Sequence, residues 1–243
     1  MDKNKRNFLK SAAATALGTV AIGEASGTTI TERPMGSEQH RWAMVVDLAK
    51  CIGCQACTVA CGMENAVPTG KFRTIVNNYE IEHKGKVHSV VLPRLCNHCE
   101  NPPCIPVCPV QATYQRSDGI VVIDNTRCVG CGYCVQACPY DARFINPETN
   151  TADKCTFCVH RVEAGLLPAC VETCVGGARI FGDLKDPDSV VSKIIGQQET
   201  KGLRPEMKTE PQVYYLGLNS HFQSKVEGSA VVWDAETIIE EHK

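Results

Sequence analysis

Apolar residues gather in short runs along this chain, and most of these runs are strand-like. Four are rich in the β-branched and aromatic residues that favour strands, and they span Trp42–Asp47, Phe72–Tyr79, Val87–Leu92 and Val213–Leu216. Polar residues from His83 to Lys86 separate the second run from the third and indicate a hairpin turn. From Asp188 to Gln198 the apolar spacing is helical, with Asp188 as the expected N-cap.

The first strand-like run has a second copy further along the chain. Val45–Asp47 and the following Lys-Cys-Ile-Gly-Cys match Val122–Asp124 and the following Arg-Cys-Val-Gly-Cys. Such an internal repeat predicts duplicated halves, each with a strand that ends in aspartate, a cysteine loop and a short helix. Gly53 and Gly130 take equivalent places in the two loops, where we expect glycine's conformational freedom to let the backbone approach a bound group.

Cysteines dominate the chemistry, and the sixteen fall into four groups of four. The groups are Cys51, Cys54, Cys57 and Cys61; Cys96, Cys99, Cys104 and Cys108; Cys128, Cys131, Cys134 and Cys138; and Cys155, Cys158, Cys170 and Cys174. The first and third have the spacing C-x2-C-x2-C-x3-C, which is typical of ferredoxins with two [4Fe–4S] clusters. Three closely spaced thiolates can wrap one cluster, while the fourth ligates the other cluster of a pair. Four groups therefore predict four clusters.

Two other uses of cysteine compete with this interpretation. Disulfides would suit an exported chain, but disulfide scaffolds are short and lack this periodic run. Structural zinc uses two C-x2-C pairs, whereas here a third cysteine follows at the same short interval and a fourth comes three residues later. The spacing favours iron–sulfur clusters over both.

Composition changes the picture in two respects. Only 6% of residues are aromatic although 43% are hydrophobic, so we expect clusters, not large side chains, to fill much of the interior. The net charge of -2 and the absence of a basic patch give no reason to expect nucleic-acid binding. The sequence contains no nucleophile–base arrangement, phosphate loop or dinucleotide motif, so we expect no catalytic residues.

The first 27 residues are typical of a targeting segment. Lys3, Lys5 and Arg6 precede a short, alanine-rich apolar run that is too weak to span a bilayer. Residues 5–10, KRNFLK, resemble the twin-arginine export signal with lysine in place of the first arginine. That route exports folded proteins, which suits a chain that must acquire its clusters before export. We therefore expect a periplasmic protein.

Several polar residues adjoin the cysteines. His98 and His160 are not expected to be ligands, because sixteen thiolates already account for four clusters, although either could donate a hydrogen bond to a sulfide. Four cations also lie beside cysteine loops: Lys50, Arg127, Lys154 and Arg161. A cation beside a cluster raises its potential, but solvated surface charge is the commoner explanation.

Longer strings resemble one family, the four-cluster electron-transfer subunits of molybdopterin oxidoreductases related to dimethyl sulfoxide reductase. The strings are RLCNHCENPPC at 94–104, CPYDAR at 138–143 and ADKCTFC at 152–158. The resemblance implies that the outer groups share ligands with each other, as do the inner groups. It gives a first set of Cys51, Cys54, Cys57 and Cys174; a second of Cys155, Cys158, Cys170 and Cys61; a third of Cys96, Cys99, Cys104 and Cys138; and a fourth of Cys128, Cys131, Cys134 and Cys108.

The same resemblance implies an α+β fold of duplicated ferredoxin-like halves. We expect a signal at 1–27, a lead-in and first strand at 28–44, and an outer unit at 45–95 plus 153–183 with a hairpin inserted at about 72–92. An inner unit at 96–152 and a C-terminal extension at 184–243, for docking or for wrapping the core, complete the chain.

The implied role is that of an electron carrier without a substrate site. A molybdopterin catalytic subunit would split tetrathionate into two thiosulfates, and an integral membrane subunit would supply electrons from quinol and hold the carrier at the outer face of the cytoplasmic membrane. A polysulfide, thiosulfate, arsenate or nitrite reductase would need the same carrier. The rival classes are an enzyme that reduces a small substrate at an exposed cluster and a zinc-stapled interaction module.

Overall fold

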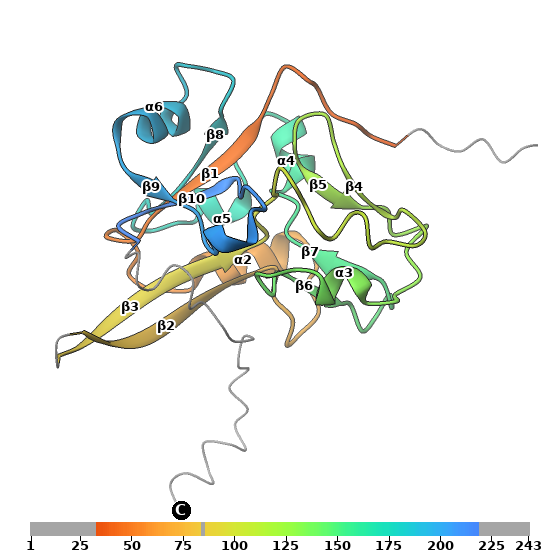
Figure 1. Ribbon diagram of the computed structural model, residues 1–243, viewed down its shortest axis with the longest axis horizontal. Helices are drawn as coiled ribbons and strands as arrows, with labels where there is room; N and C mark the ends of the chain where they lie inside the picture. Colours follow the sequence, from red (N-terminus) through yellow and green to blue (C-terminus); the bar gives the residue numbers. More distant parts are fainter. Residues whose placement is uncertain (1–32, 84–85, 219–243) are drawn as a thin grey trace, which may run out of the picture. The chain divides into compact units, whose positions relative to one another are not determined.

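The computed structural model describes residues 33–83 and 86–218. Its four-stranded sheet takes strands from both ends of this described part of the chain (Figure 1). Its order is β8-β1-β10-β9, with bounds β8 Arg179–Asp183, β1 Trp42–Asp47, β10 Val213–Leu216 and β9 Thr200–Lys201. β1 pairs antiparallel with β8 and parallel with β10. The strands expected at 42–47 and 213–216 are both confirmed.

Both faces of β1 are covered. Met44 and Val46 join a core cluster that includes several cysteines, whereas Ala43 and Val45 pack with Val191 on the other face. All four of these β1 residues are fully buried. Since side chains alternate between the faces of a strand, β1 divides the cysteine-rich core from a smaller apolar layer.

Helix α6, Val190–Gln197, covers that smaller layer. The helix lies where the sequence indicated one, but the expected N-cap was wrong. Ser189 is the N-cap, and its Oγ accepts a hydrogen bond from the Ser192 amide at 3.3 Å. Asp188 lies one residue too early and forms a solvent-exposed ion pair with Lys193 instead.

The cap can be tested by substitution. We expect Ser189→Ala to lower the free energy of unfolding by about 0.5–2 kcal/mol, because an amide at the start of α6 loses its acceptor. Asp188→Ala is the matched control and should change it little, since exposed ion pairs contribute little. Chemical denaturation under anaerobic conditions measures both, and a larger loss for Asp188→Ala would contradict this account of the cap.

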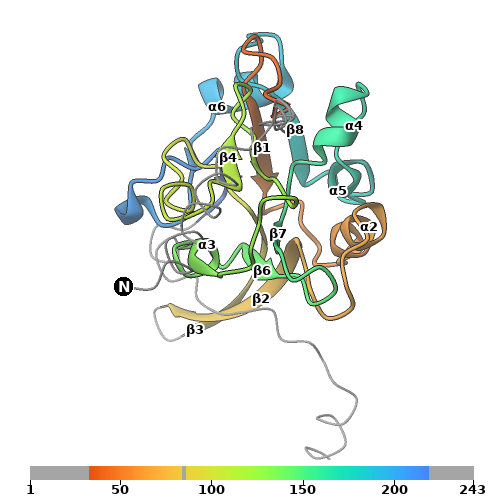
Figure 2. The same ribbon diagram turned by 90° about the vertical axis from the view of Figure 1, so that its right-hand side faces the viewer.

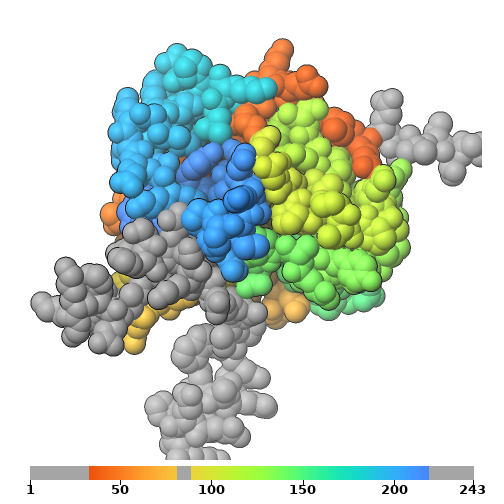
Figure 3. Space-filling view, in the orientation of Figure 1, coloured from red at the N-terminus to blue at the C-terminus, as the bar shows by residue number. Residues whose placement is uncertain are grey.

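The described part of the C-terminal extension wraps the chain's own core. It supplies α6, β9, the 3-10 turn Pro205–Met207 and β10. The amides of Glu100 and Asn101 donate to the carbonyls of Glu210 and Thr209, and Figure 3 shows this blue segment beside the yellow-green surface near residue 100. Residues 184–218 thus pack against the rest of the chain, and the role of the extension in docking stays a prediction.

Strands β2, Thr74–His83, and β3, Lys86–Leu95, form an antiparallel pair. Leu92 and Leu95 are buried in the cysteine-rich core, with Val76, Tyr79 and Val90 packed at its edge. This end of the pair covers the core, and Figure 1 shows the other end extending away from it.

Short elements surround the cysteine loops. Two strand pairs join β4 Thr113–Gln115 to β5 Val121–Ile123 and β6 Arg143–Ile145 to β7 Ala152–Lys154. The helices are α2 Ala56–Glu64, α3 Tyr133–Gln136, α4 Val159–Glu163 and α5 Ala169–Glu172. Figure 2 shows α2, α4 and α5 together on one side. Small mixed sheets with few, short helices agree with the predicted α+β class.

Some predictions concern residues that the structure does not describe. The targeting segment at 1–27, the first part of the lead-in, the hairpin residues 84–85 and the end of the extension at 219–243 lie outside the described residues. Contacts divide the chain into residues 1–34 and 35–243. Within the described ranges, no helix has both the length and the apolar character needed to cross a membrane.

Candidate metal centres

All sixteen cysteines lie within the described residues, and all are free thiols. The fold therefore does not contain the eight disulfides of the alternative interpretation. Most of the thiols are buried or partly buried, whereas Cys54 and Cys131 are exposed. These two take the same place in the repeat, as the second cysteine of the first and third groups.

The four thiols of the first predicted set line one pocket. Cys51, Cys54 and Cys57 come from the loop before α2 and its first turn, and Cys174 from the loop after α5. The Ala178 amide donates to Cys174 Sγ at 3.2 Å. Four thiols from two distant segments thus face one space, as the shared-ligand scheme expects.

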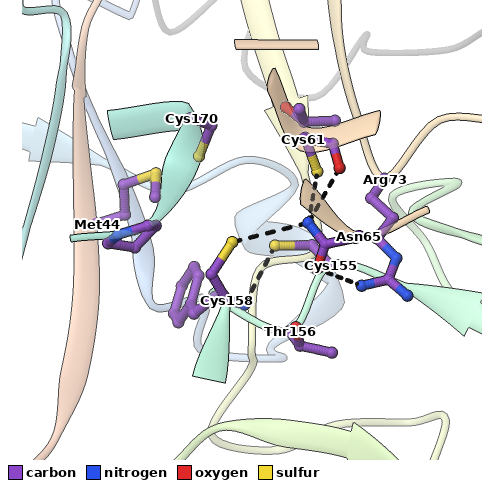
Figure 4. A pocket seen from close by; sticks show the side chains of 11 residues that line it. Met44, Cys61, Asn65, Arg73, Cys155, Thr156, Cys158 and Cys170 are labelled. Atoms are coloured by element: carbon purple, nitrogen blue, oxygen red, sulfur yellow. Dashed lines mark hydrogen bonds between the residues drawn. The ribbon is translucent and has the colours of Figure 1, made fainter. Parts of the chain in front are cut away.

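The second predicted set lines another pocket. Cys61, Cys155, Cys158 and Cys170 surround it, and Figure 4 shows their sulfur atoms turned toward a common space. Asn65 Nδ2 lies 3.7 Å from Cys61 Sγ and 3.8 Å from Cys158 Sγ. Burial, followed by the neighbouring Cys170 and Cys158, raises the pKa of Cys61 to about 12.

The raised pKa values of these thiols indicate that their thiolate forms need a compensating positive charge. Burial and then Cys61 and Cys170 raise the pKa of Cys155 well above its ordinary value. Only the thiolate binds metal, and several thiolates in one buried pocket repel each other. The donor set therefore suits a positively charged metal core, whose binding compensates for removal of the protons.

The other three thiols of the third predicted set act electrostatically on Cys99. Burial first, and then the charges of Cys96, Cys138 and Cys104, raise its pKa to about 12 against a hydrogen bond with Thr209. The pKa of Cys104 is raised to about 11 by burial, although the nearby guanidinium of Arg143 opposes the rise. Arg143 Nη2 lies 2.9 Å from Cys104 Sγ.

For the fourth predicted set, the structure shows the surroundings of individual cysteines. Cys128 and Cys134 pack at the same apolar cluster, and the Ala152 amide donates to Cys128 Sγ at 3.3 Å. Burial raises the pKa of Cys108, but hydrogen bonds from the amides of Thr113 and Ala112 outweigh it and leave the pKa lowered. The grouping of all four thiols stays a prediction.

The repeat links each strand end to a distant cysteine. The Asp47 amide donates to the Ala178 carbonyl at 2.8 Å, and the Asp124 amide donates to the Ala112 carbonyl at the same distance. Ala178 and Ala112 each donate their own amides, at 3.2 Å, to Cys174 and Cys108 respectively. The first group therefore lies beside Cys174 and the third beside Cys108, as the predicted ligand sets require.

The glycines expected to have a backbone role both have positive φ, 71° at Gly53 and 68° at Gly130. A Cβ at Gly130 would lie only 2.2 Å from the Asn150 carbonyl oxygen, whereas at Gly53 the nearest atom is Val91 Cγ1 at 3.5 Å. Both loops thus need the left-handed conformation, but only the Gly130 loop also needs the missing side chain.

This difference gives a matched pair of variants. We expect Gly53→Ala to lower the free energy of unfolding by about 1–2 kcal/mol, the cost of a left-handed alanine. Gly130→Ala should cost about 2–4 kcal/mol, because the backbone at Asn150 must also move. Anaerobic denaturation of the cluster-loaded chain measures the difference, and equal losses would contradict it.

Polar residues near the cysteines take different places. His98 is buried, stacks on Phe157 and accepts a hydrogen bond on Nδ1 from the Val121 amide at 3.0 Å. Burial, then the charges of Lys154 and Arg143, holds the pKa of His98 well below its ordinary range. The His98 Nε2 atom is buried and has no hydrogen-bond partner among the described residues, whereas His160 forms a surface contact with Glu64.

The four cations expected beside the cysteine loops divide into two kinds. Lys50 and Arg127 pair with the strand-ending aspartates, and Arg161 pairs with Glu64 and Glu172. Lys154 is buried, so the surface explanation is wrong for this residue. Sequence reasoning missed further buried cations, among them Arg143 and Arg179, although each of these two lies five positions after the last cysteine of its group.

Comparison with known proteins agrees with this chemistry. Two family models, both described as 4Fe-4S dicluster domains, match residues 50–112 and 87–184. The chain is 60% identical over 236 residues to a tetrathionate reductase subunit of Salmonella typhimurium, covering 95% of this chain and 94% of that protein. The chain thus holds iron–sulfur clusters, and the zinc alternative is not supported.

Two further relatives differ in the substrates that their names give. A tetrathionate reductase subunit of Archaeoglobus fulgidus is 47% identical over 191 residues, which cover 75% of this chain and 89% of the relative. A selenate reductase subunit of Mesobacillus selenatarsenatis is 40% identical over 218 residues, with 76% and 74% covered. The similarity is strongest, among these three, to the tetrathionate reductase subunit of Salmonella.

Proposed function

Because the chain belongs to the family of iron–sulfur subunits that includes those of the tetrathionate reductases, we propose that it carries electrons through four [4Fe–4S] clusters to a catalytic subunit that reduces tetrathionate. The identity over nearly the whole length of the Salmonella relative carries the assignment of substrate. The chain itself would carry electrons and leave catalysis to its partner subunit.

Four sets of thiols would hold the clusters, in the arrangement given above. The observation that carries this assignment is that the first and second sets each line a pocket of their own. When bound, such clusters take up and release one electron at a time. The chain's own groups bury the thiolates, donate amide hydrogen bonds to sulfur and supply the nearby positive charge.

We propose the duplicated architecture as the framework of these sets. The outer unit comprises 45–95 and 153–183 with the hairpin as an insertion, and the inner unit comprises 96–152. The equivalent hydrogen bonds that the amides of Asp47 and Asp124 donate support the duplication. The two dicluster matches, at 50–112 and 87–184, are consistent with up to two clusters each.

Two partners follow from the role of an electron carrier: a molybdopterin catalytic subunit and an integral membrane subunit that oxidises quinol. Apolar side chains border both exposed cysteines and support two docking surfaces. Ile52 and Val175 lie largely exposed near the first set, and Val129 and Tyr133 near the fourth. Exposed apolar residues that gather beside a redox site suit contact with another protein.

An enzyme acting alone at an exposed cluster is the rival function. The proposed scheme uses all sixteen thiols as ligands, which leaves no open iron site. If the isolated chain reduced tetrathionate with an artificial electron donor, the rival would be supported and the carrier role rejected. We expect no such activity without the catalytic subunit.

We further propose export to the periplasm through the twin-arginine-like segment at 1–27, with attachment to the outer face of the cytoplasmic membrane through the membrane partner. Cell fractionation of the full chain and of Arg6→Gln tests this. The parent should be periplasmic, and the variant should accumulate in the cytoplasm with its clusters assembled. Unchanged export of the variant would contradict the proposed signal.

The cofactor content tests the central assignment. Anaerobically purified full-length chain should contain about sixteen iron atoms and about sixteen acid-labile sulfides, since each cubane holds four of each. A brown protein with that content supports four clusters. A colourless chain that contains zinc would overturn the proposal.

A further inference from the structure

Three buried cations in this core have no carboxylate partner. Arg143, Lys154 and Arg179 are 5%, 1% and 3% exposed. Other largely buried arginines are paired: Arg73 with Asp153 at 2.8 Å and Arg116 with Asp118 at 2.9 Å. Across residues 33–83 and 86–218, no Asp or Glu forms an ion pair with any of the three.

Arg179 lies between the first and second sets. Its side chain lines the pocket of the first set, and its Nη2 donates to Thr74 Oγ1 at 2.7 Å. Thr74 in turn lines the pocket of the second set. The Nη1 atom is buried and has no hydrogen-bond acceptor among the described residues.

The charges around Arg179 are thiols of both sets. Burial disfavours its charged form, but Cys170 of the second set and Cys57 of the first outweigh burial and raise its pKa. Arg179 also acts on Cys51 and on Cys61. The guanidinium therefore faces negative charge from two directions.

Lys154 occupies the corresponding place between the second and third sets. Its Nζ donates to the Cys155 carbonyl at 2.8 Å and to the Val121 carbonyl. Val121 packs in one apolar cluster with Cys104 of the third set. Burial, together with the charge of Arg143, lowers the pKa of Lys154, whereas Cys96 and Cys104 of the third set and Cys155 of the second oppose this fall.

Arg143 lies at the junction of the third and fourth sets. Its Nη2 is 2.9 Å from Cys104 Sγ, and its Nη1 is 3.2 Å from Thr113 Oγ1. The thiols that raise its pKa against burial are, in order, Cys104 and Cys96 of the third set and then Cys134 of the fourth. Each of the three junctions thus contains one buried cation.

An unpaired buried charge is strongly unfavourable unless an opposite charge compensates it. Among residues 33–83 and 86–218, the negative charge that acts on these cations comes mainly from the thiols, which would hold the clusters as thiolates. Reduction adds a further negative charge to a cluster, so a fixed cation beside it favours the reduced form. A cation at a junction acts on two clusters at once.

Resting on the proposed function, we propose that Arg179, Lys154 and Arg143 tune the reduction potentials of the clusters. One of these cations lies at each junction between neighbouring sets, and each raises the reduction potentials of the two adjoining clusters. Arg179 acts on the first and second clusters, Lys154 on the second and third, and Arg143 on the third and fourth. The pairwise pattern distinguishes this role from general stabilisation of the fold.

The test is redox titration of the full-length chain, monitored by electron paramagnetic resonance, for Arg179→Gln, Lys154→Gln and Arg143→Gln. We expect each variant to lower the equilibrium constant for reduction of its two adjoining clusters by about tenfold, which is about 59 mV for one electron. The two remote clusters should keep their potentials.

Lys193→Gln is the control for loss of one positive charge. Lys193 is solvent-exposed on α6 and pairs with Asp188, so solvent screens its charge and its loss should change the potentials far less. Unchanged potentials in the three junction variants would overturn the proposal, as would shifts of clusters that do not adjoin the substituted residue or an equal shift in Lys193→Gln.

Charge-retaining variants keep the test decisive if the glutamine variants do not assemble. Arg143→Lys and Arg179→Lys should load the full iron content and stay near the parent potentials, because the charge remains. If these variants also lose clusters, shape and not charge is what the junctions require, and the proposal is overturned. Iron content that differs from four cubanes in the parent chain would instead reject the proposed function.

Discussion

Replacing Cys174 with serine is expected to damage the cluster held by Cys51, Cys54 and Cys57 and to leave the other three intact. The reason is that Cys174 lines the same pocket as those three thiols, although it lies in the fourth group of the sequence. Loss of one thiolate ligand should remove the cubane signal of this cluster, and iron should fall by up to about four atoms per chain. Iron analysis and electron paramagnetic resonance measure both changes.

Cys170→Ser is the matched control for this experiment. Cys170 belongs to the same sequence group but lines the pocket of the second set, so its loss should damage the cluster held by Cys155, Cys158 and Cys61. If Cys174→Ser damages that second cluster alone, the shared-ligand scheme is wrong. Identical effects of the two variants would also contradict it.

The largest effect on stability is expected at Tyr215, in β10, an inner strand of the four-stranded sheet. Tyr215 is fully buried in the cysteine-rich core, and its hydroxyl donates to the Pro93 carbonyl at 2.9 Å. Tyr215→Ala should lower the free energy of unfolding by about 3–5 kcal/mol, the usual cost of removing a buried aromatic ring. Anaerobic chemical denaturation, followed by circular dichroism, measures it.

Tyr215→Phe separates the ring from the hydroxyl. It keeps the buried ring and should cost only about 1–2 kcal/mol, for the lost hydrogen bond and the unpaired Pro93 carbonyl. An effect of Tyr215→Ala below about 1 kcal/mol, which is less than one buried hydrogen bond contributes, would mean that β10 is dispensable. The C-terminal segment would then not be part of the core.

Local features of this fold could be predicted from sequence because they depend on nearby residues. The strand at 42–47 follows from its β-branched residues, and the repeat predicted equivalent loops after Asp47 and Asp124. In both turns the aspartate Oδ1 accepts from the amide two residues later, at 3.1 and 3.0 Å. Positive φ at Gly53 and Gly130 follows for the same reason.

Long-range pairings could not be predicted in this way. The run at 213–216 indicated a strand, but nothing in its residues specifies that it pairs in parallel with β1 rather than binding a partner. The N-cap of α6 was missed because Asp188 and Ser189 are both good caps, and tertiary contacts decide between them. Ser192, whose amide caps on Ser189, also donates its hydroxyl to the Asp183 carbonyl of β8.

Cations at the same position relative to the cysteine groups differ in burial. Lys50, Arg127 and Lys154 each directly precede the first cysteine of a group, yet only Lys154 is buried, because β7 carries it into the core against Val121. Arg143 and Arg179 share a position relative to the last cysteine of their groups, and this spacing is a signal that could have identified them. The ligand sets came from family resemblance, since spacing alone leaves the pairing of the groups open.

The most direct test of the account is anaerobic reoxidation. The purified complex is reduced with dithionite, and its visible absorbance is followed as tetrathionate, polysulfide, thiosulfate or arsenate is added separately. Rapid reoxidation by tetrathionate and not by the other acceptors is the predicted result. If the clusters stay reduced with tetrathionate but are reoxidised by another acceptor, the assignment to tetrathionate reduction is wrong.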